Sequence, residues 1–202
     1  MNRRGGSANQ VRVIAGQWRG RRLEFPDLPG LRPTPDRVRE TLFNWLAPVL
    51  PGARCLDLFA GSGALGIEAL SRGATEVVLV EREPLAVRAL RENLARLNAA
   101  NARVEISDAL AWLRQPATPF EIVFLDPPFG QGLLKPVCAL LEQHGWLADP
   151  AWIYLEAEME LERLTLPAEW MLYREKIAGA VAYRLARREM ATLTCGPSPA
   201  CG

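Results

Sequence analysis

Two short stretches of this chain carry residue types and spacings that could do chemistry. In the first, an apolar run that begins at Cys55 ends at Asp57, and Gly61, Gly63 and Gly66 follow at G-x-G-x-x-G spacing. Glycine allows a positive φ and lets a ligand approach where a Cβ would collide. A strand, a tight turn and a helix in this order predict a Rossmann-like nucleotide site. The same spacing serves dinucleotides and other adenosine cofactors, and it can also merely tighten a turn.

The second stretch is Asp126-Pro127-Pro128-Phe129, which follows another apolar run. Two successive prolines remove two backbone donors, so the Asp126 carboxylate and the Pro127 carbonyl remain as acceptors. An aromatic amine donates two hydrogens, which these two acceptors can hold while they aim its nitrogen at a third group. Phe129 can stack on the face of an extruded base. The stretch predicts an amine-binding catalytic loop.

Acidic residues also end the neighbouring predicted strands. Glu81 follows the strand after the glycine loop, where a carboxylate can accept both ribose hydroxyls of an adenosine. Asp108 and Ala109 end the next strand, where a carboxylate and a backbone N–H could read adenine. Asp57 could face a positively charged part of the ligand. One such acid is usually a helix cap or a solvated residue, but four in register indicate a site at the carboxyl edge of a sheet.

The N-terminal segment is basic. Residues 1–22 contain six arginines and no Asp or Glu, and the total net charge of +1 leaves about −5 on the rest. A basic arm favours a polyanion such as RNA over a merely solvated segment. Trp18 could stack on a base or plug a hairpin onto the domain. The expected RNA-binding residues are Arg12, Trp18, Arg19, Arg21 and Arg22.

The order of predicted elements indicates an α/β fold. Strands at 54–58, 76–80, 103–107, 120–125 and 152–156 alternate with helices at 36–46, 64–72, 84–97, 109–114 and 133–143. Two further strands at 170–176 and 181–187 flank Gly179 as an antiparallel pair. We therefore expect a seven-stranded, mostly parallel sheet with helices on both faces. Thr34 is expected to cap the first helix, with Pro35 at its first position.

The predicted organisation has four parts: a disordered arm at 1–10, an N-terminal β-hairpin extension at 11–30, a catalytic domain at 31–190 and a flexible tail at 191–202. No apolar run is long enough to span a bilayer, and no secretory signal is present. The four cysteines lack metal-type spacing and fit a reducing compartment, and the single histidine excludes multi-histidine sites. We expect a cytoplasmic monomer without a bound metal.

The two loops resemble the cofactor loop and the catalytic loop of class I S-adenosylmethionine-dependent amino-methyltransferases. Over about residues 10–190, the chain resembles the bacterial 16S ribosomal RNA guanine-N2 methyltransferase family. The family-specific marks are the arginine-rich stretches that begin at Arg12 and Leu31, and the late stretch from Arg174 to Arg184. The resemblance implies a class I methyltransferase fold and methylation of one loop guanine of 16S RNA in the small ribosomal subunit, guanine 966 in the usual numbering.

The resemblance also implies site residues. The catalytic loop is Asp126, Pro127, Pro128 and Phe129. The residues expected to bind S-adenosylmethionine are Asp57, Phe59, Ala60, Gly61, Ser62, Gly63, Glu81, Arg82, Asp108 and Ala109. Arg32, Arg37 and Arg39 are left open between RNA contacts, the cofactor carboxylate and helix-surface pairs.

Three alternative functions remain at this stage. A nicotinamide dehydrogenase fits the glycine spacing and Glu81 but leaves Asp126-Pro127-Pro128-Phe129 unexplained. An amino-methyltransferase acting on DNA or another RNA, at adenine N6 or cytosine N4, fits the same acceptor pair. A catalytically silent RNA-binding assembly factor is the third, and the complete loops argue against it.

Overall fold

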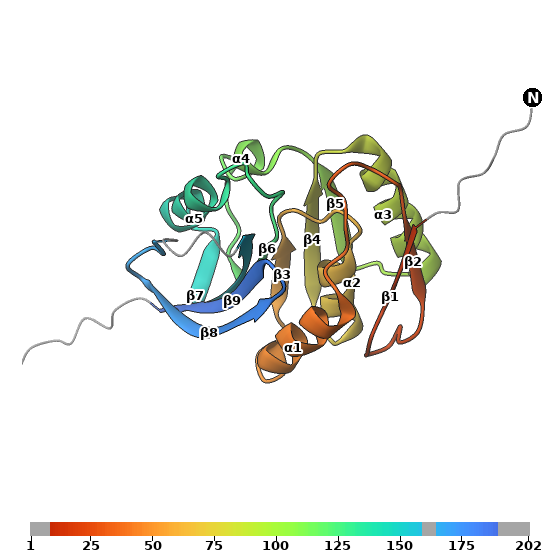
Figure 1. The fold of residues 1–202 in the computed structure, drawn as a ribbon, viewed down its shortest axis with the longest axis horizontal. Helices are drawn as coiled ribbons and strands as arrows, with labels where there is room; N and C mark the ends of the chain where they lie inside the picture. The colour runs from red at the N-terminus through yellow and green to blue at the C-terminus, as the bar shows by residue number, and fades with distance from the viewer. Residues whose placement is uncertain (1–8, 159–164, 190–202) are drawn as a thin grey trace, which may run out of the picture.

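The computed structural model describes residues 9–158 and 165–189, and within them seven strands form one mixed sheet. Its order is β5-β4-β3-β6-β7-β9-β8, as Figure 1 shows. The parallel strands are β3 (Arg54–Asp57), β4 (Glu76–Glu81), β5 (Ala102–Ile106), β6 (Phe120–Leu125) and β7 (Leu147–Glu158). The antiparallel pair is β8 (Trp170–Ala178) and β9 (Val181–Arg188), which turn at Gly179. The predicted sheet is confirmed.

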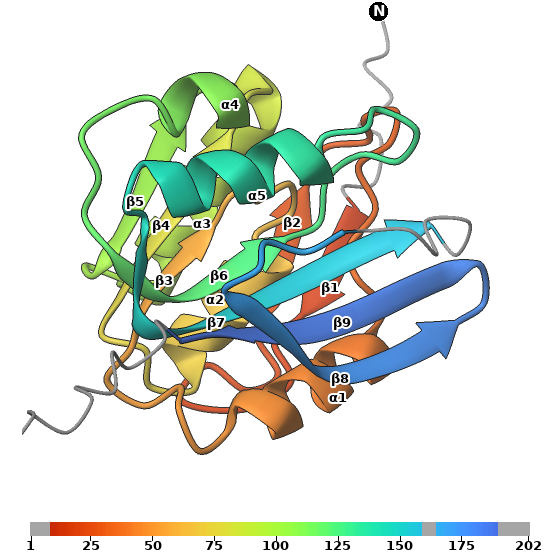
Figure 2. The same cartoon turned by 90° about the vertical axis from the view of Figure 1, so that its left-hand side faces the viewer.

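Helices cover both faces of this sheet. They are α1 (Asp36–Leu46), α2 (Ala64–Ser71), α3 (Pro84–Leu97), α4 (Ala109–Trp112) and α5 (Leu134–Gln143). Successive strand residues point to opposite faces, so β3 sends Cys55 into one core and Leu56 into the other. The first core also contains α1, α2 and α3, and the second contains α4 and α5. Figure 2 shows α4 and α5 on one side of the sheet and α1 on the other.

An antiparallel hairpin of β1 (Asn9–Arg12) and β2 (Arg22–Phe25) packs beside α3. Asn9 and Gln10 were expected in the disordered arm but belong to β1, because they pair with Phe25 and Glu24. The rest of that arm, residues 1–8, and the predicted tail at 191–202 lie outside the described residues.

The turn of the hairpin is anchored to the last residue of α2. The backbone N–H of Gln17 donates to the Ser71 carbonyl at 2.8 Å, and the Trp18 N–H donates to the Ser71 hydroxyl at 3.0 Å. Gly16 has a φ of +80°, and a Cβ there would lie 1.7 Å from the Ser71 carbonyl oxygen. The close approach therefore requires glycine at this position.

A buried ion cluster joins the N-terminal segment to two helices. Glu68 of α2 is fully buried, and its carboxylate accepts hydrogen bonds from the backbone N–H groups of Ile14 and Ala15, at 2.8 and 2.9 Å. The same carboxylate accepts from Arg72 at 2.7 Å and lies 3.5 Å from the fully buried guanidinium of Arg39. Buried charges of this kind persist only when they are paired and hydrogen-bonded.

This geometry decides the role that was left open for Arg39 and corrects the one predicted for Thr34. Arg39 is fully buried and does not line the cavity. It pairs with Asp36 of its own helix, which was one of the alternatives, and it also donates to the backbone carbonyls of Thr34 and Arg12. Thr34 is not the cap of α1: Pro35 occupies the N-cap position, without a side-chain cap bond. The Thr34 hydroxyl instead donates to Asp126, in the loop after β6.

Within the described residues, no helix is long and apolar enough to cross a membrane, and no cluster of His, Cys, Asp and Glu suits a metal ion. Cys55 and Cys138 are buried free thiols.

Replacing Glu68 with Gln should destabilise the fold by about 3 kcal/mol or more, because it leaves the Arg39 charge buried with one fewer counter-charge. Urea unfolding at pH 7 measures this loss. The matched control is Glu92→Gln, which removes a carboxylate paired with Arg88 on the exposed surface of α3. The control should leave the midpoint almost unchanged. Equal midpoints for the two variants would show that the cluster does not hold the N-terminal segment.

Candidate active site

A cavity of about 830 Å³ opens at the carboxyl edge of the parallel strands. It is lined by the connector 28–35 before α1, the glycine loop after β3, the ends of β4 and β5, the loop after β6, and single residues of β7 and β9. The sheet register brings these ends together, since Asp57 pairs with Leu79 on one side and with Phe124 on the other. Ligands bind at this edge in open α/β sheets, as the glycine spacing predicts.

The glycine loop is held by the end of β4. The Gly61 N–H and the Glu83 N–H each donate to one oxygen of the Glu81 carboxylate, both at 2.8 Å. A carboxylate has about four acceptor positions, so Glu81 can still accept from a ligand hydroxyl. Gly61 has a φ of +50° and lines the cavity, and a Cβ there would meet no atom closer than 3.8 Å.

Gly63 has a different role from Gly61. It does not line the cavity, although the sequence indicated a cofactor contact. A Cβ at Gly63 would lie 2.5 Å from Leu90 and 2.9 Å from Ile67, so this glycine lets α3 pack against the start of α2. Gly66 likewise packs against the sheet, with a Cβ position 2.9 Å from Leu79.

Asp57 is buried at the back of the cavity. Its Oδ2 atom accepts a hydrogen bond from the Gly66 N–H at 2.9 Å, which ties β3 to α2. Burial raises the pKa of Asp57 to about 7, and the nearby charge of Glu81 adds to the rise, while the Gly66 hydrogen bond lowers it. At neutral pH this carboxyl group is therefore poised to ionise next to a positively charged ligand.

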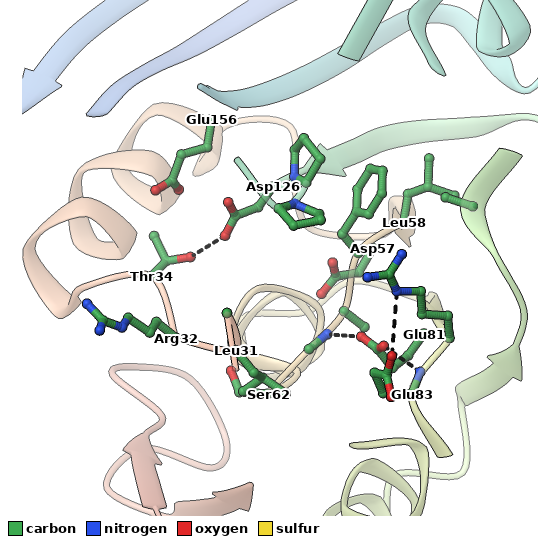
Figure 3. A pocket seen from close by; sticks show the side chains of 18 of the residues that line it. Leu31, Arg32, Thr34, Asp57, Leu58, Ser62, Glu81, Glu83, Asp126 and Glu156 are labelled. Atoms are coloured by element: carbon green, nitrogen blue, oxygen red, sulfur yellow. Dashed lines mark hydrogen bonds and ion pairs between the residues drawn. The ribbon is translucent and has the colours of Figure 1, made fainter. Parts of the chain in front are cut away.

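Asp126 begins the loop after β6 and faces the cavity (Figure 3). The buried Thr34 hydroxyl donates to its Oδ2 atom at 3.3 Å. Burial and the like charge of Glu156 raise the pKa of Asp126 well above its usual range, and the Thr34 hydrogen bond lowers it. Pro127 and Pro128 line the cavity behind it, and Phe129 is 46% exposed at the mouth.

Glu156 is a cavity residue that the sequence reasoning missed. It follows Leu155, the last β7 residue that pairs with β6, and Leu155 is paired with Leu125, so Glu156 and Asp126 occupy equivalent positions along the two adjacent strands. Glu156 is still within β7, where it pairs with Tyr183 of β9. Figure 3 places both side chains on one wall of the cavity together with Thr34. The rule that selected the other strand-end acids also applies to Glu156, because the predicted strand ended at residue 156.

The remaining predicted cofactor residues lie along the cavity. These are Phe59, Ala60, Ser62, Arg82, Asp108 and Ala109. Asp108 also caps α4, where its Oδ1 atom accepts from the Ala111 N–H at 3.1 Å, and Arg82 pairs with Glu83. Helix capping leaves further acceptor positions on the Asp108 carboxylate.

The predicted RNA-binding residues lie outside the cavity lining. Trp18 and Arg19 belong to the turn against Ser71, at the far end of α2 from the glycine loop. Trp18 is partly buried against the first core, in agreement with a hairpin plug. Arg12 is paired with Asp36, and Arg19, Arg21 and Arg22 are exposed.

The charges in the cavity are unbalanced. Six carboxylates line it, those of Asp57, Glu81, Glu83, Asp108, Asp126 and Glu156, against two arginines, Arg32 and Arg82. Among the described residues only Glu83 forms an ion pair, with Arg82. Buried carboxylates without a counter-charge are costly, so the cavity favours a ligand that carries positive charge. Its loop chemistry favours a substrate with an aromatic amine.

Comparisons with known proteins agree with this geometry. Residues 11–187 match the family described as conserved hypothetical protein 95. The chain is 60% identical to ribosomal RNA small subunit methyltransferase D of Escherichia coli K12 over 90% of this chain and 92% of that protein. It is 46% identical to the protein of the same name from Haemophilus influenzae, over 87% and 93% of the two chains.

A solved structure from Escherichia coli, described as a proposed methyltransferase, superposes with a TM-score of 0.85 at 57% identity. The match covers 90% of this chain and 99% of that one. The Rossmann-like methyltransferase fold expected from the sequence is therefore confirmed. The chain belongs to the conserved hypothetical protein 95 family, which is the family of ribosomal RNA small subunit methyltransferase D.

Proposed function

We propose that this protein transfers a methyl group from S-adenosylmethionine to the exocyclic N2 of one guanine of 16S RNA in the small ribosomal subunit. By the family resemblance, that guanine is number 966 in the usual numbering. The observation that carries the proposal is the placement of Asp126 and Pro127 at a cavity with six lining carboxylates, of which only Glu83 is ion-paired among the described residues. The names of the relatives, which are small-subunit RNA methyltransferases, support it.

The residues present fit the cofactor. S-adenosylmethionine carries a sulfonium and an ammonium group, and bound here it would supply an electrophilic methyl group. The open space over Gly61 would accept it, with Glu81 as the acceptor for its ribose hydroxyls and Asp108 with Ala109 at its adenine. Asp57 would balance positive charge. In this assignment the unpaired carboxylates select a cation.

The chain's own contribution to the reaction is positioning. The Asp126 carboxylate and the Pro127 carbonyl accept the two hydrogens of the guanine amine, which aims the nitrogen into the cavity. Asp126 stabilises the positive charge that develops on this nitrogen and then receives its proton. Thr34 holds one oxygen of Asp126 in place, and Phe129 stacks on the base.

The target base must leave its stack to reach this cavity, so an unpaired or extruded nucleotide is required. Arg12, Arg19, Arg21 and Arg22, exposed around the hairpin, contact phosphates of the surrounding RNA in this proposal. Because the turn carrying Arg19 lies at the far end of α2, its contacts are remote from the methylated base. Trp18 then anchors the hairpin.

Replacing Asp126 with Ala should lower the rate of methyl transfer to unmodified small subunits by at least about a hundredfold, because it removes an acceptor that acts on the developing charge. Single-turnover transfer of labelled methyl measures the rate. Calorimetry on the same variant should find cofactor affinity within a few-fold of the parent. Retained transfer would exclude Asp126 as the amine-binding group, and lost cofactor binding would make it a cofactor residue.

Asp57 should make cofactor binding depend on pH. Its pKa of about 7 means that it is protonated below pH 7 in the free protein, whereas a bound cation favours the ionised form. Affinity for S-adenosylmethionine should therefore fall by about tenfold from pH 8 to pH 6. Asp57→Asn should remove this part of the slope, and comparing the two proteins cancels the titration of the ligand itself.

The same variant has an opposite effect on stability. Asp57 has a higher pKa in the folded than in the unfolded chain, so its contribution is greatest at low pH and is lost as pH rises to about 7. Asp57→Asn should accordingly raise the melting temperature at pH 8 while weakening cofactor binding. A lower melting temperature of Asp57→Asn at pH 8 would show that Asp57 stabilises the free protein, and it would contradict the view that this carboxylate serves cofactor binding at the expense of stability.

A further inference from the structure

The mechanism above leaves one buried carboxylate of the cavity without a role. Glu156 is only 6% exposed, and its Oε2 atom accepts a hydrogen bond from the buried Tyr154 hydroxyl at 2.9 Å. Its Oε1 atom accepts no hydrogen bond from the described residues, and the side chain lines the cavity. A purely structural role would explain the hydrogen bond between Oε2 and Tyr154. It would not explain why Oε1, in a side chain that lines the cavity, has no donor.

The free oxygen lies on the wall that carries Asp126. Because Leu125 pairs with Leu155, the backbones of Asp126 and Glu156 occupy equivalent positions on two neighbouring strands. The axes of such strands lie about 4.8 Å apart. Figure 3 shows both side chains reaching into the same part of the cavity. Two carboxylates at this spacing can reach two adjacent donors on one planar base.

Guanine is the common base that offers such a pair of donors. Its N1–H lies directly beside the C2 amino group, whereas the ring nitrogen beside the amino group of adenine or cytosine is an acceptor. An ionised carboxylate only accepts hydrogen bonds, so it can pair with the N1–H of guanine and with neither of the other two ring nitrogens. A base without this donor would leave Glu156 buried and unpaired.

We propose that Glu156 is the residue that selects guanine, by accepting the N1–H while Asp126 and the Pro127 carbonyl hold the N2 amine. Tyr154 is its positioning residue, because the phenol holds the second oxygen and turns the first toward the base. This inference rests on the proposed function, and it supplies the specificity that the acceptor pair alone lacks, since that pair fits any aromatic amine.

The test uses 2-aminopurine, which retains the C2 amine but has an acceptor at N1. Small subunits are reconstituted with 16S RNA that carries either guanine or 2-aminopurine at the methylated position. Single-turnover methyl transfer is measured on both. The wild-type protein should prefer guanine by at least about a hundredfold, as expected for a site built to bond one substrate donor.

Glu156→Gln should shrink this preference by at least about tenfold, because the amide can donate to the N1 of 2-aminopurine. The matched control is Glu175→Gln, the same substitution at an exposed position of β8 that lines neither this cavity nor the one beside it, and it should leave the preference unchanged. S-adenosylmethionine binding should be retained in both variants. If Glu156→Gln does not fold, Glu156→Ala should lose discrimination without gaining activity on 2-aminopurine.

An equal loss on both substrates would overturn the inference, because it would make Glu156 structural. An unchanged preference would overturn it as well. If the wild-type protein binds the cofactor but methylates neither substrate, the proposed function itself fails, and the assignment of Glu156 falls with it.

Discussion

The buried carboxylate of Glu68 is the constraint on which the two walls of the cavity depend. It holds the backbone at Ile14 and Ala15 and lies beside the guanidinium of Arg39. Arg39 in turn bonds the Thr34 carbonyl, at the end of the connector that forms one cavity wall. Glu68 itself belongs to α2, which begins directly after the glycine loop, another part of the cavity lining. The ion pair between Glu68 and Arg39 therefore links the helix that follows the glycine loop to the connector that ends at Thr34.

The cavity itself works against stability. Parallel strands in register bring Asp57, Glu81, Asp126 and Glu156 to one edge, and burial raises the pKa of three of them, those of Asp57, Asp126 and Glu156. A well-packed apolar lining would be more stable than this arrangement. A ligand that carries positive charge and amine hydrogens would offset the free-energy cost of burying these carboxylates. The same carboxylates would therefore select such a ligand over a neutral or negatively charged one. The Thr34 and Tyr154 hydroxyls then orient the two acids that face the base.

Much of this architecture was predictable from local sequence signals. Alternating apolar runs and helical periodicity predicted the seven strands, and the strand-end rule placed Asp57, Glu81, Asp108 and Asp126 at one edge. Glu156 obeys the same rule but was overlooked, because no short motif surrounds it. Partners distant in sequence were beyond local signals: Thr34 bonds Asp126 across 92 positions, and it was expected to cap a helix. The role of Arg39 was left open between three alternatives, because its partners outside its own helix, Glu68 among them, are distant in sequence.

The measurement that tests the central claim most directly is labelled methyl transfer from S-adenosylmethionine to unmodified small ribosomal subunits, with free 16S RNA and duplex DNA in parallel. Nucleoside digestion then identifies the product. The account predicts label as N2-methylguanosine in the subunit RNA. Label only in DNA, or at an adenine or cytosine amine, would contradict the substrate assignment. Bound cofactor without transfer to any of the three would contradict catalysis itself and favour a silent RNA-binding factor.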